Sequence, residues 1–160
     1  MSFTLYCATQ RGDKRNTLYP RRRVITGFSD LQTAARFDHV AAEFEGSRRS
    51  LDGFKLAECI VLDVDNDHGQ IVQPEQIAKD FPGVAHMIVF SRHDMQPKGS
   101  SPAVPRFHCY FPVAPTADRA EVEQLKRSVC AAFSYFDANA IDAARFLFGV
   151  ESPRGFAVEG

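Results

Sequence analysis

The sequence has no apolar run long enough to cross a membrane, and its N-terminus lacks the charged and then apolar pattern of a signal peptide. Its four cysteines are widely separated and form no C-x-x-C pair, which argues against a structural zinc site. Internal repeats and low-complexity tracts are also absent from the sequence. We therefore expect a soluble, cytoplasmic protein that does not bind membranes and keeps its cysteines reduced in the core.

The net charge of −1 hides two parts of opposite sign. Residues 1–55 contain ten Lys or Arg and six acids, whereas the rest contains nine Lys or Arg and fourteen acids. A basic part can meet a phosphate backbone, and an acidic part can be neutralised by metal ions, a combination that suits a polynucleotide enzyme. For any one basic cluster, the alternative is a solvated loop. The basic residues that we expect to contact DNA are Arg15, Arg21, Arg22, Arg23, Arg48 and Arg49.

Apolar residues make up 44% of the chain, enough to fill the core of a single domain over residues 1–160. Apolar segments predict strands at 3–9, 24–26, 59–65, 84–91 and 106–113, the last two as a hairpin. Helical spacing and end signals predict helices at about 30–45, 74–82 and 115–133, and a helix or turn at 138–148. This order predicts an α/β or α+β fold with a central mixed sheet flanked by helices.

Two carboxylates, Asp63 and Asp65, end the apolar run 59–65. Because side chains alternate along a strand, both project from the same face. Like charges at this spacing repel unless a cation joins them, and a hard ion such as Mg²⁺ or Mn²⁺ takes oxygen ligands and is completed by phosphates. The pair therefore indicates half of a phosphate-handling metal site, the alternative being a strand end that runs into an acidic, solvated loop.

Other functions also fit an acidic strand end. A metal-dependent nuclease or phosphohydrolase uses paired acids there, although aspartyl-phosphate phosphatases have Thr or Val where this chain has Asp67. A non-catalytic module that binds single-stranded DNA is a further alternative. A calcium-binding loop that starts at Asp63 is not expected, because its sixth position is His68 instead of Gly and its twelfth is Pro74 instead of Glu.

Three segments together resemble the archaeo-eukaryotic primase superfamily, in particular the primase-polymerase domains of phage and plasmid replication proteins. Residues 60–68 (IVLDVDNDH) look like the family's paired-acid motif on a strand. Residues 91–112 are similar to its nucleotide-binding motif, and residues 136–149 (FDANAIDAARFLFG) to its third motif, an acid with a downstream arginine. The resemblance covers roughly residues 25–150.

The resemblance implies a catalytic core with an RRM-like part and the activity of a template-dependent nucleotidyltransferase, a DNA primase or DNA polymerase that uses two Mg²⁺ or Mn²⁺ ions. The implied partners are a single-stranded DNA template, deoxy- or ribonucleoside triphosphates, and a helicase domain or another part of a replisome. A phage-encoded protein of this kind works in the cytoplasm of the host cell. The chain is compatible with the N-terminal part of a longer replication protein.

The resemblance also implies site residues. Asp63 and Asp65 would bridge the ions, and Asp137 would supply a third carboxylate, with Asp142 as the alternative. Taken alone, a histidine in an apolar strand is more often a core residue, and Arg145 can pair with Asp142 on a helix face as well as bind phosphate. The implied nucleotide-binding residues are Ser91, Arg92, Lys98, Arg106, His108 and Arg145.

Overall fold

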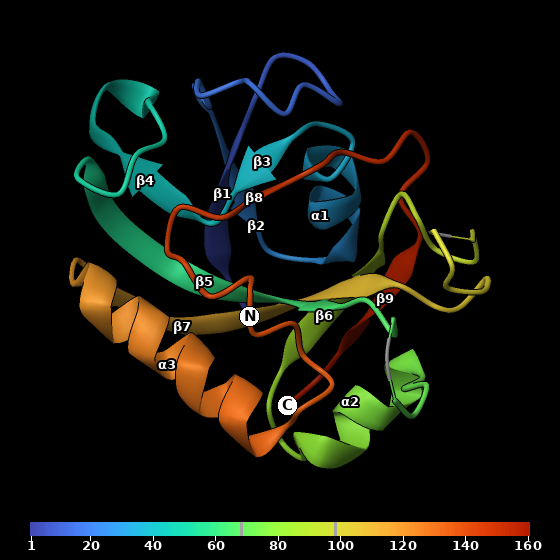
Figure 1. The fold of residues 1–160 in the computed structure, drawn as a ribbon. Helices are drawn as coiled ribbons and strands as arrows, with labels where there is room; N and C mark the ends of the chain where they lie inside the picture. The colour runs from blue at the N-terminus through green and yellow to red at the C-terminus, as the bar shows by residue number, and fades with distance from the viewer. Residues whose placement is uncertain (68, 98) are drawn as a thin grey trace.

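The computed structural model describes residues 1–67, 69–97 and 99–160, which form two antiparallel sheets (Figure 1). The four-stranded sheet has the order β2 (Arg21–Ile25), β1 (Phe3–Cys7), β3 (His39–Val40) and β8 (Phe146–Leu147). The five-stranded sheet has the order β4 (Ala42–Phe44), β5 (Phe54–Val64), β7 (Phe107–Thr116), β6 (His86–Phe90) and β9 (Gly155–Val158). The helices are α1 (Phe28–Ala34), the 3₁₀ turn η1 (Glu45–Ser47), α2 (Pro74–Asp80) and α3 (Arg119–Ala132).

The five-stranded sheet is the middle layer of the molecule. In Figure 1, α2 and α3 lie below it, and the four-stranded sheet and α1 lie above it. Alternate residues of β5 therefore enter different cores: Leu62 packs in a cluster with Val122 of α3, and Val61 in a cluster with Phe3 of β1. Coverage on both faces explains why β5 is apolar almost throughout, as the sequence predicted.

The antiparallel register of β5 and β7 places the predicted motifs side by side. Asp63 is directly opposite His108, and a bulge near Ala57 and Cys59 interrupts the pairing further back along β5. Strand β6 pairs with β7 on its other side, which confirms the predicted hairpin of 84–91 with 106–113. The end of β5 thus meets the start of β7 at one edge of the sheet.

The α+β class is confirmed, but several predicted elements are wrong. The expected helix at 30–45 ends at Ala34, and β3 and β4 follow it. Residues Val40, Ala42 and Phe44 are buried at a spacing of two, and their strand partners outweigh the approximate helical spacing. The strands also divide between two antiparallel sheets instead of one mixed sheet.

The C-terminal part of the chain has turns and short strands. Residues 138–148, predicted to form a helix or a turn, contain turns and the short strand β8. No local pattern predicts β9, and the three arginines before the predicted strand 24–26 belong to β2. Across residues 1–67, 69–97 and 99–160, no helix combines the length and the apolar character that a membrane span requires.

A buried histidine joins the two sheets. His39 Nδ1 lies 2.8 Å from the carbonyl of Phe37, and its Nε2 lies 2.8 Å from the hydroxyl of Tyr110 on β7. A carbonyl only accepts hydrogen bonds, so Nδ1 donates and Nε2 of the neutral ring accepts from Tyr110. Complete burial lowers the pKa of His39 to about 4.

This histidine predicts an acid-sensitive fold. The unfolded chain binds a proton at His39 near pH 6.5, whereas the folded protein does so only near pH 4. The contribution of His39 to the free energy of unfolding is therefore fully present above pH 6.5 and is lost as the pH falls toward 4. Between pH 6.5 and about pH 5, we expect the free energy of unfolding to fall by about 2 kcal/mol. Burial lowers the pKa of His86 as well, which adds to the decline. Urea unfolding of wild type and His39→Gln at several pH values in this range checks this. If the free energy of unfolding of the variant falls with pH as steeply as that of wild type, the prediction is wrong.

Candidate active site

Asp63 is the buried centre of the candidate site. It lies near the end of β5, with its side chain 8% exposed, and its Oδ1 lies 2.8 Å from Nδ1 of His108 on the neighbouring strand. Its Oδ2 accepts a hydrogen bond of 3.0 Å from the guanidinium of Arg145. Burial alone would raise the pKa of Asp63, but the interactions with His108 and then Arg145 hold it below its usual range. Asp63 is therefore ionised and held on both oxygens.

The segment before β8 brings the third motif to the first. The backbone N–H of Asp137 donates to the carbonyl of Asp63 at 2.9 Å, so the two aspartates are neighbours in space. Arg145 follows in the same segment, and its side chain reaches Asp63. Its contact with Asp142 is between backbones, from the Arg145 N–H to the Asp142 carbonyl at 3.3 Å. Two roles were predicted for the Arg145 side chain, an ion pair with Asp142 and a phosphate contact. In the structure it pairs with Asp63, and the phosphate contact stays a prediction.

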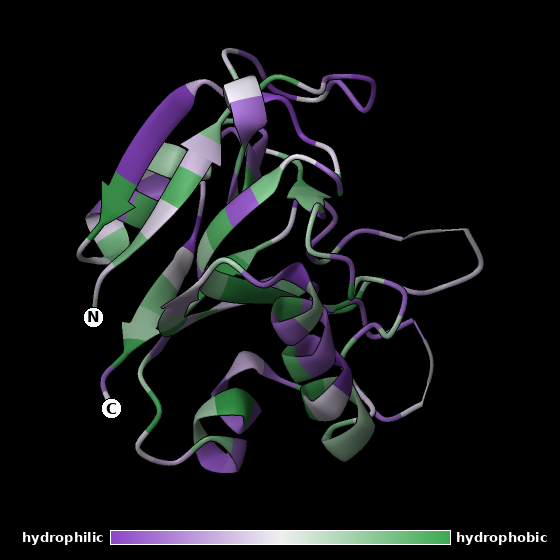
Figure 2. Ribbon diagram, turned by 90° about the vertical axis from the view of Figure 1, so that its left-hand side faces the viewer, coloured by the Kyte–Doolittle hydropathy of each residue, from purple (hydrophilic) through white to green (hydrophobic). Residues whose placement is uncertain are grey.

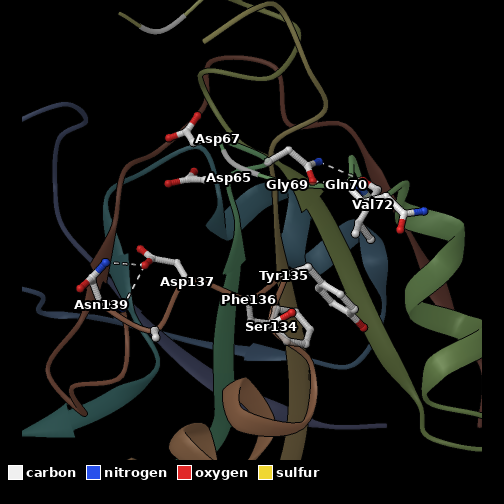
Figure 3. Close-up of a pocket in the computed structure, with 12 residues that line it drawn as sticks. Asp65, Asp67, Gly69, Gln70, Val72, Ser134, Tyr135, Phe136, Asp137 and Asn139 are labelled. Carbon is white, nitrogen blue, oxygen red and sulfur yellow. Dashed lines mark hydrogen bonds between the residues drawn. The ribbon is translucent and has the colours of Figure 1, made fainter. Parts of the chain in front are cut away.

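A pocket of about 520 Å³ opens between the end of β5 and the segment after α3. Asp65, Asp67 and Asp137 lie together on one side of it, and the ring of Tyr135 lies on another (Figure 3). The Oδ1 atom of Asp137 accepts hydrogen bonds from the backbone and side-chain nitrogens of Asn139 at 2.9 and 3.0 Å. Two of the predicted metal ligands, one from each motif, therefore share a pocket wall.

The donors on this wall fit a hard divalent cation in type and in place, since Asp65 and Asp137 bring carboxylate oxygens from two chain segments. The set is incomplete: among the described residues, no three His, Cys, Asp or Glu side chains are grouped closely enough to hold an ion. Asp63, which was predicted to bridge the ions together with Asp65, directs its oxygens to His108 and Arg145 instead. A cation at this place would have to compete with those partners.

The side chain of Arg106 is buried and makes contacts within the protein. It is 0% exposed, and its NH2 group lies 2.8 Å from Oδ1 of Asp67. Its NH1 group donates to the carbonyls of Gln96 at 2.7 Å and His93 at 3.3 Å. These contacts tie the loop after β6 to the acidic end of β5, and the predicted phosphate contact of Arg106 stays untested.

Two other predicted nucleotide ligands, Ser91 and Arg92, follow β6 directly. The hydroxyl of Ser91 accepts from the backbone N–H of His93 at 3.2 Å. The guanidinium of Arg92 lies over the ring of Phe148, 3.6 Å from its centroid, which brings it toward the segment that carries Arg145. The predicted ligand Lys98 lies outside the described residues.

The predicted DNA-binding arginines gather around the four-stranded sheet. Strand β2 is an edge strand whose first three residues, all arginines, are exposed, and it forms a hydrophilic band in Figure 2. Arg15 and Arg48 are also exposed. Arg49 is more enclosed: it donates to the carbonyl of Ala144 at 3.1 Å and lies over the ring of Phe146. It therefore contacts the segment next to the candidate site.

Sequence reasoning missed a buried lysine that supports the site. Lys126 of α3 is 3% exposed, and its ammonium group donates to the carbonyl of Asp142 at 3.3 Å. Burial lowers its pKa. The spacing of apolar residues could have predicted this burial. Lys126 lies four residues after Val122 and four before Cys130, so it shares their buried helix face.

No family model and no curated protein matches this sequence. Among solved structures, the chain is similar to the archaeo-eukaryotic primase (AEP) domain of the primase-polymerase (PrimPol) from cyanophage S-2L. The match has a TM-score of 0.48 and 14% sequence identity, and it covers 99% of this chain and 80% of that chain. A likeness of this strength says nothing about what the present chain binds, so the functional conclusion rests on the site itself.

Proposed function

We propose that this chain is a template-dependent nucleotidyltransferase, a DNA primase-polymerase of a phage or plasmid replication system. The observation that supports this most is the common pocket of Asp65 and Asp137, together with the backbone hydrogen bond that places Asp137 next to Asp63. Acids from two motifs that converge next to histidine and arginine side chains suit a reaction in which a hydroxyl attacks a nucleoside triphosphate. The charge asymmetry of the sequence agrees with such a substrate.

In this proposal Asp63, Asp65 and Asp137 would hold a pair of Mg²⁺ or Mn²⁺ ions, which when bound stabilise charge on the attacking and leaving oxygens. Asp63 orients the imidazole of His108 through Nδ1, so a phosphate contact by this ring would use Nε2. The guanidinium of Arg145 offers a planar set of donors that matches phosphate oxygens. Arg92, near the same segment, would add a second positive charge.

The template would be single-stranded DNA that follows the exposed arginines of β2 toward the site. Binding through these side chains should be independent of sequence and should weaken as salt increases. Deoxy- or ribonucleoside triphosphates would be the second substrate. A helicase domain or a replisome partner would supply the unwound template.

A direct assay tests the proposed activity. The protein is incubated with a labelled template, with and without a primer, together with nucleotides and Mg²⁺ or Mn²⁺. We expect the protein to incorporate the nucleotides that are complementary to the template, in template order. A protein carrying both Asp63→Ala and Asp65→Ala, purified identically, controls for contaminating polymerase. Degradation of the labelled strand would favour a nuclease. Binding of single-stranded DNA without extension under any metal would favour a non-catalytic module, and either result contradicts the proposal.

A further inference from the structure

The two partners of Asp63 differ in how firmly they are held. His108 comes from the adjacent strand, and its side chain is 17% exposed. Arg145 comes from the segment before β8, and its side chain is 41% exposed although its guanidinium touches a carboxylate that is only 8% exposed. An arginine that reaches in from the surface can leave by rotating its side chain, whereas the imidazole is fixed by its strand.

The backbone beneath Arg145 is anchored independently of this contact. The Asp137 N–H donates to the Asp63 carbonyl, and the ammonium group of Lys126 donates to the Asp142 carbonyl. Arg145 can therefore release Asp63 without moving the segment that carries Asp137. The released Oδ2 atom belongs to a residue that lies two positions before Asp65 in the chain and whose backbone carbonyl accepts from the Asp137 N–H.

We infer that Arg145 occupies the place of a cation at Asp63 and that a divalent ion bound at Asp65 and Asp137 displaces it, so that Asp63 becomes a third ligand. This inference deepens the proposed function and rests on it. The exchange keeps the buried carboxylate neutralised in both states, because one positive partner replaces another. Arg145 thus regulates the site: it lowers the affinity for the ion and moves only when the ion arrives.

A double-mutant cycle on cation binding tests this inference without any measurement of activity. Binding of Mn²⁺ to the protein alone is followed by electron paramagnetic resonance for wild type, Arg145→Met, Asp63→Asn and the double variant. We expect Arg145→Met to tighten Mn²⁺ binding about fivefold, the size expected from loss of a half-exposed ion pair. In the Asp63→Asn background the same change should have little effect, because the arginine no longer competes there.

A matched arginine controls for general electrostatics. Arg49 lies beside the same segment and donates to the carbonyl of Ala144. We expect Arg49→Met to change Mn²⁺ affinity by less than about twofold, since Arg49 contacts a carbonyl and an aromatic ring and does not compete for a predicted ligand of the ion. Equal tightening by Arg145→Met with and without Asp63, or equal tightening by Arg49→Met, would overturn the inference, as would absence of Mn²⁺ binding in all variants.

A second measurement covers the case in which Asp63→Asn does not fold. The guanidinium ¹⁵N–¹H signal of Arg145 is assigned in the wild-type protein by comparison with Arg145→Met and followed during titration with Mg²⁺. Displacement predicts that this signal shifts and approaches the position of an exposed arginine, and an unshifted signal at saturating Mg²⁺ contradicts it. Protein that binds cations in this way but does not extend primers would refute the proposed function alone.

Discussion

Asp137→Asn is expected to lower nucleotide incorporation about a thousandfold, the usual cost of removing a group that stabilises transition-state charge. Asp142→Asn should remain within about threefold of wild type. The reason is placement: Asp137 lines the pocket with Asp65, whereas Asp142 lines a separate small cavity with Lys126. Primer extension under saturating template and nucleotide measures both variants.

The two substitutions are well matched, because each replaces a carboxylate with an amide of the same shape. Asn at position 137 can still accept the hydrogen bonds that Asn139 donates, so the fold should be preserved. Thermal unfolding of both variants checks this. Full activity of Asp137→Asn together with loss of activity in Asp142→Asn would make Asp142 the third carboxylate instead.

Arg106→Met is expected to destabilise the protein by about 3 kcal/mol, because it removes a completely buried arginine from its ion pair with Asp67, whose side chain is 22% exposed. It also leaves the carbonyls of Gln96 and His93 without this donor. Arg11→Met is the control at the surface, since Arg11 makes an ion pair with Glu151 at 3.8 Å and the two side chains are 37% and 85% exposed. Its loss should cost less than about 1 kcal/mol.

Urea unfolding midpoints compare the two arginine variants. The expected difference identifies Arg106 as a structural tie between the loop after β6 and Asp67. If Arg106→Met unfolds like wild type but binds nucleoside triphosphates much more weakly, the structural interpretation is wrong. The phosphate contact implied by the sequence would then be the better account of this residue.

The sequence predicted the elements whose pattern is local. Strand β5, with Asp63 near its end and Asp65 just after it, follows from an apolar run with a charged end, and α3 follows from helical spacing. The neighbours of Asp63 could not be predicted in the same way. His108 and Arg145 both carried the expectation of binding phosphate, and only the folded chain brings them to one carboxylate.

The wrong predictions have a related cause. Residues 30–45 have apolar positions that satisfy a helix approximately and a strand approximately, and the choice depends on partners far along the chain. Val40 finds Tyr6 of β1 on one side and Phe146 of β8 on the other. Asp38 accepts from the backbone N–H groups of Gly12, Asp13 and Gly149, which fixes the chain just after α1. No local rule contains these contacts.

The bulge near Ala57 and Cys59 determines which face of the sheet each later residue of β5 points to. From there to Asp63, successive side chains alternate between the two faces of the sheet without interruption. One residue inserted or deleted between Cys59 and Leu62 would therefore move each following side chain to the opposite face. The carboxylate would then point into the apolar cluster that contains Val122 of α3, and Leu62 or Val64 would lie opposite His108. Point changes of apolar type should be tolerated in this stretch, whereas changes in its length should not.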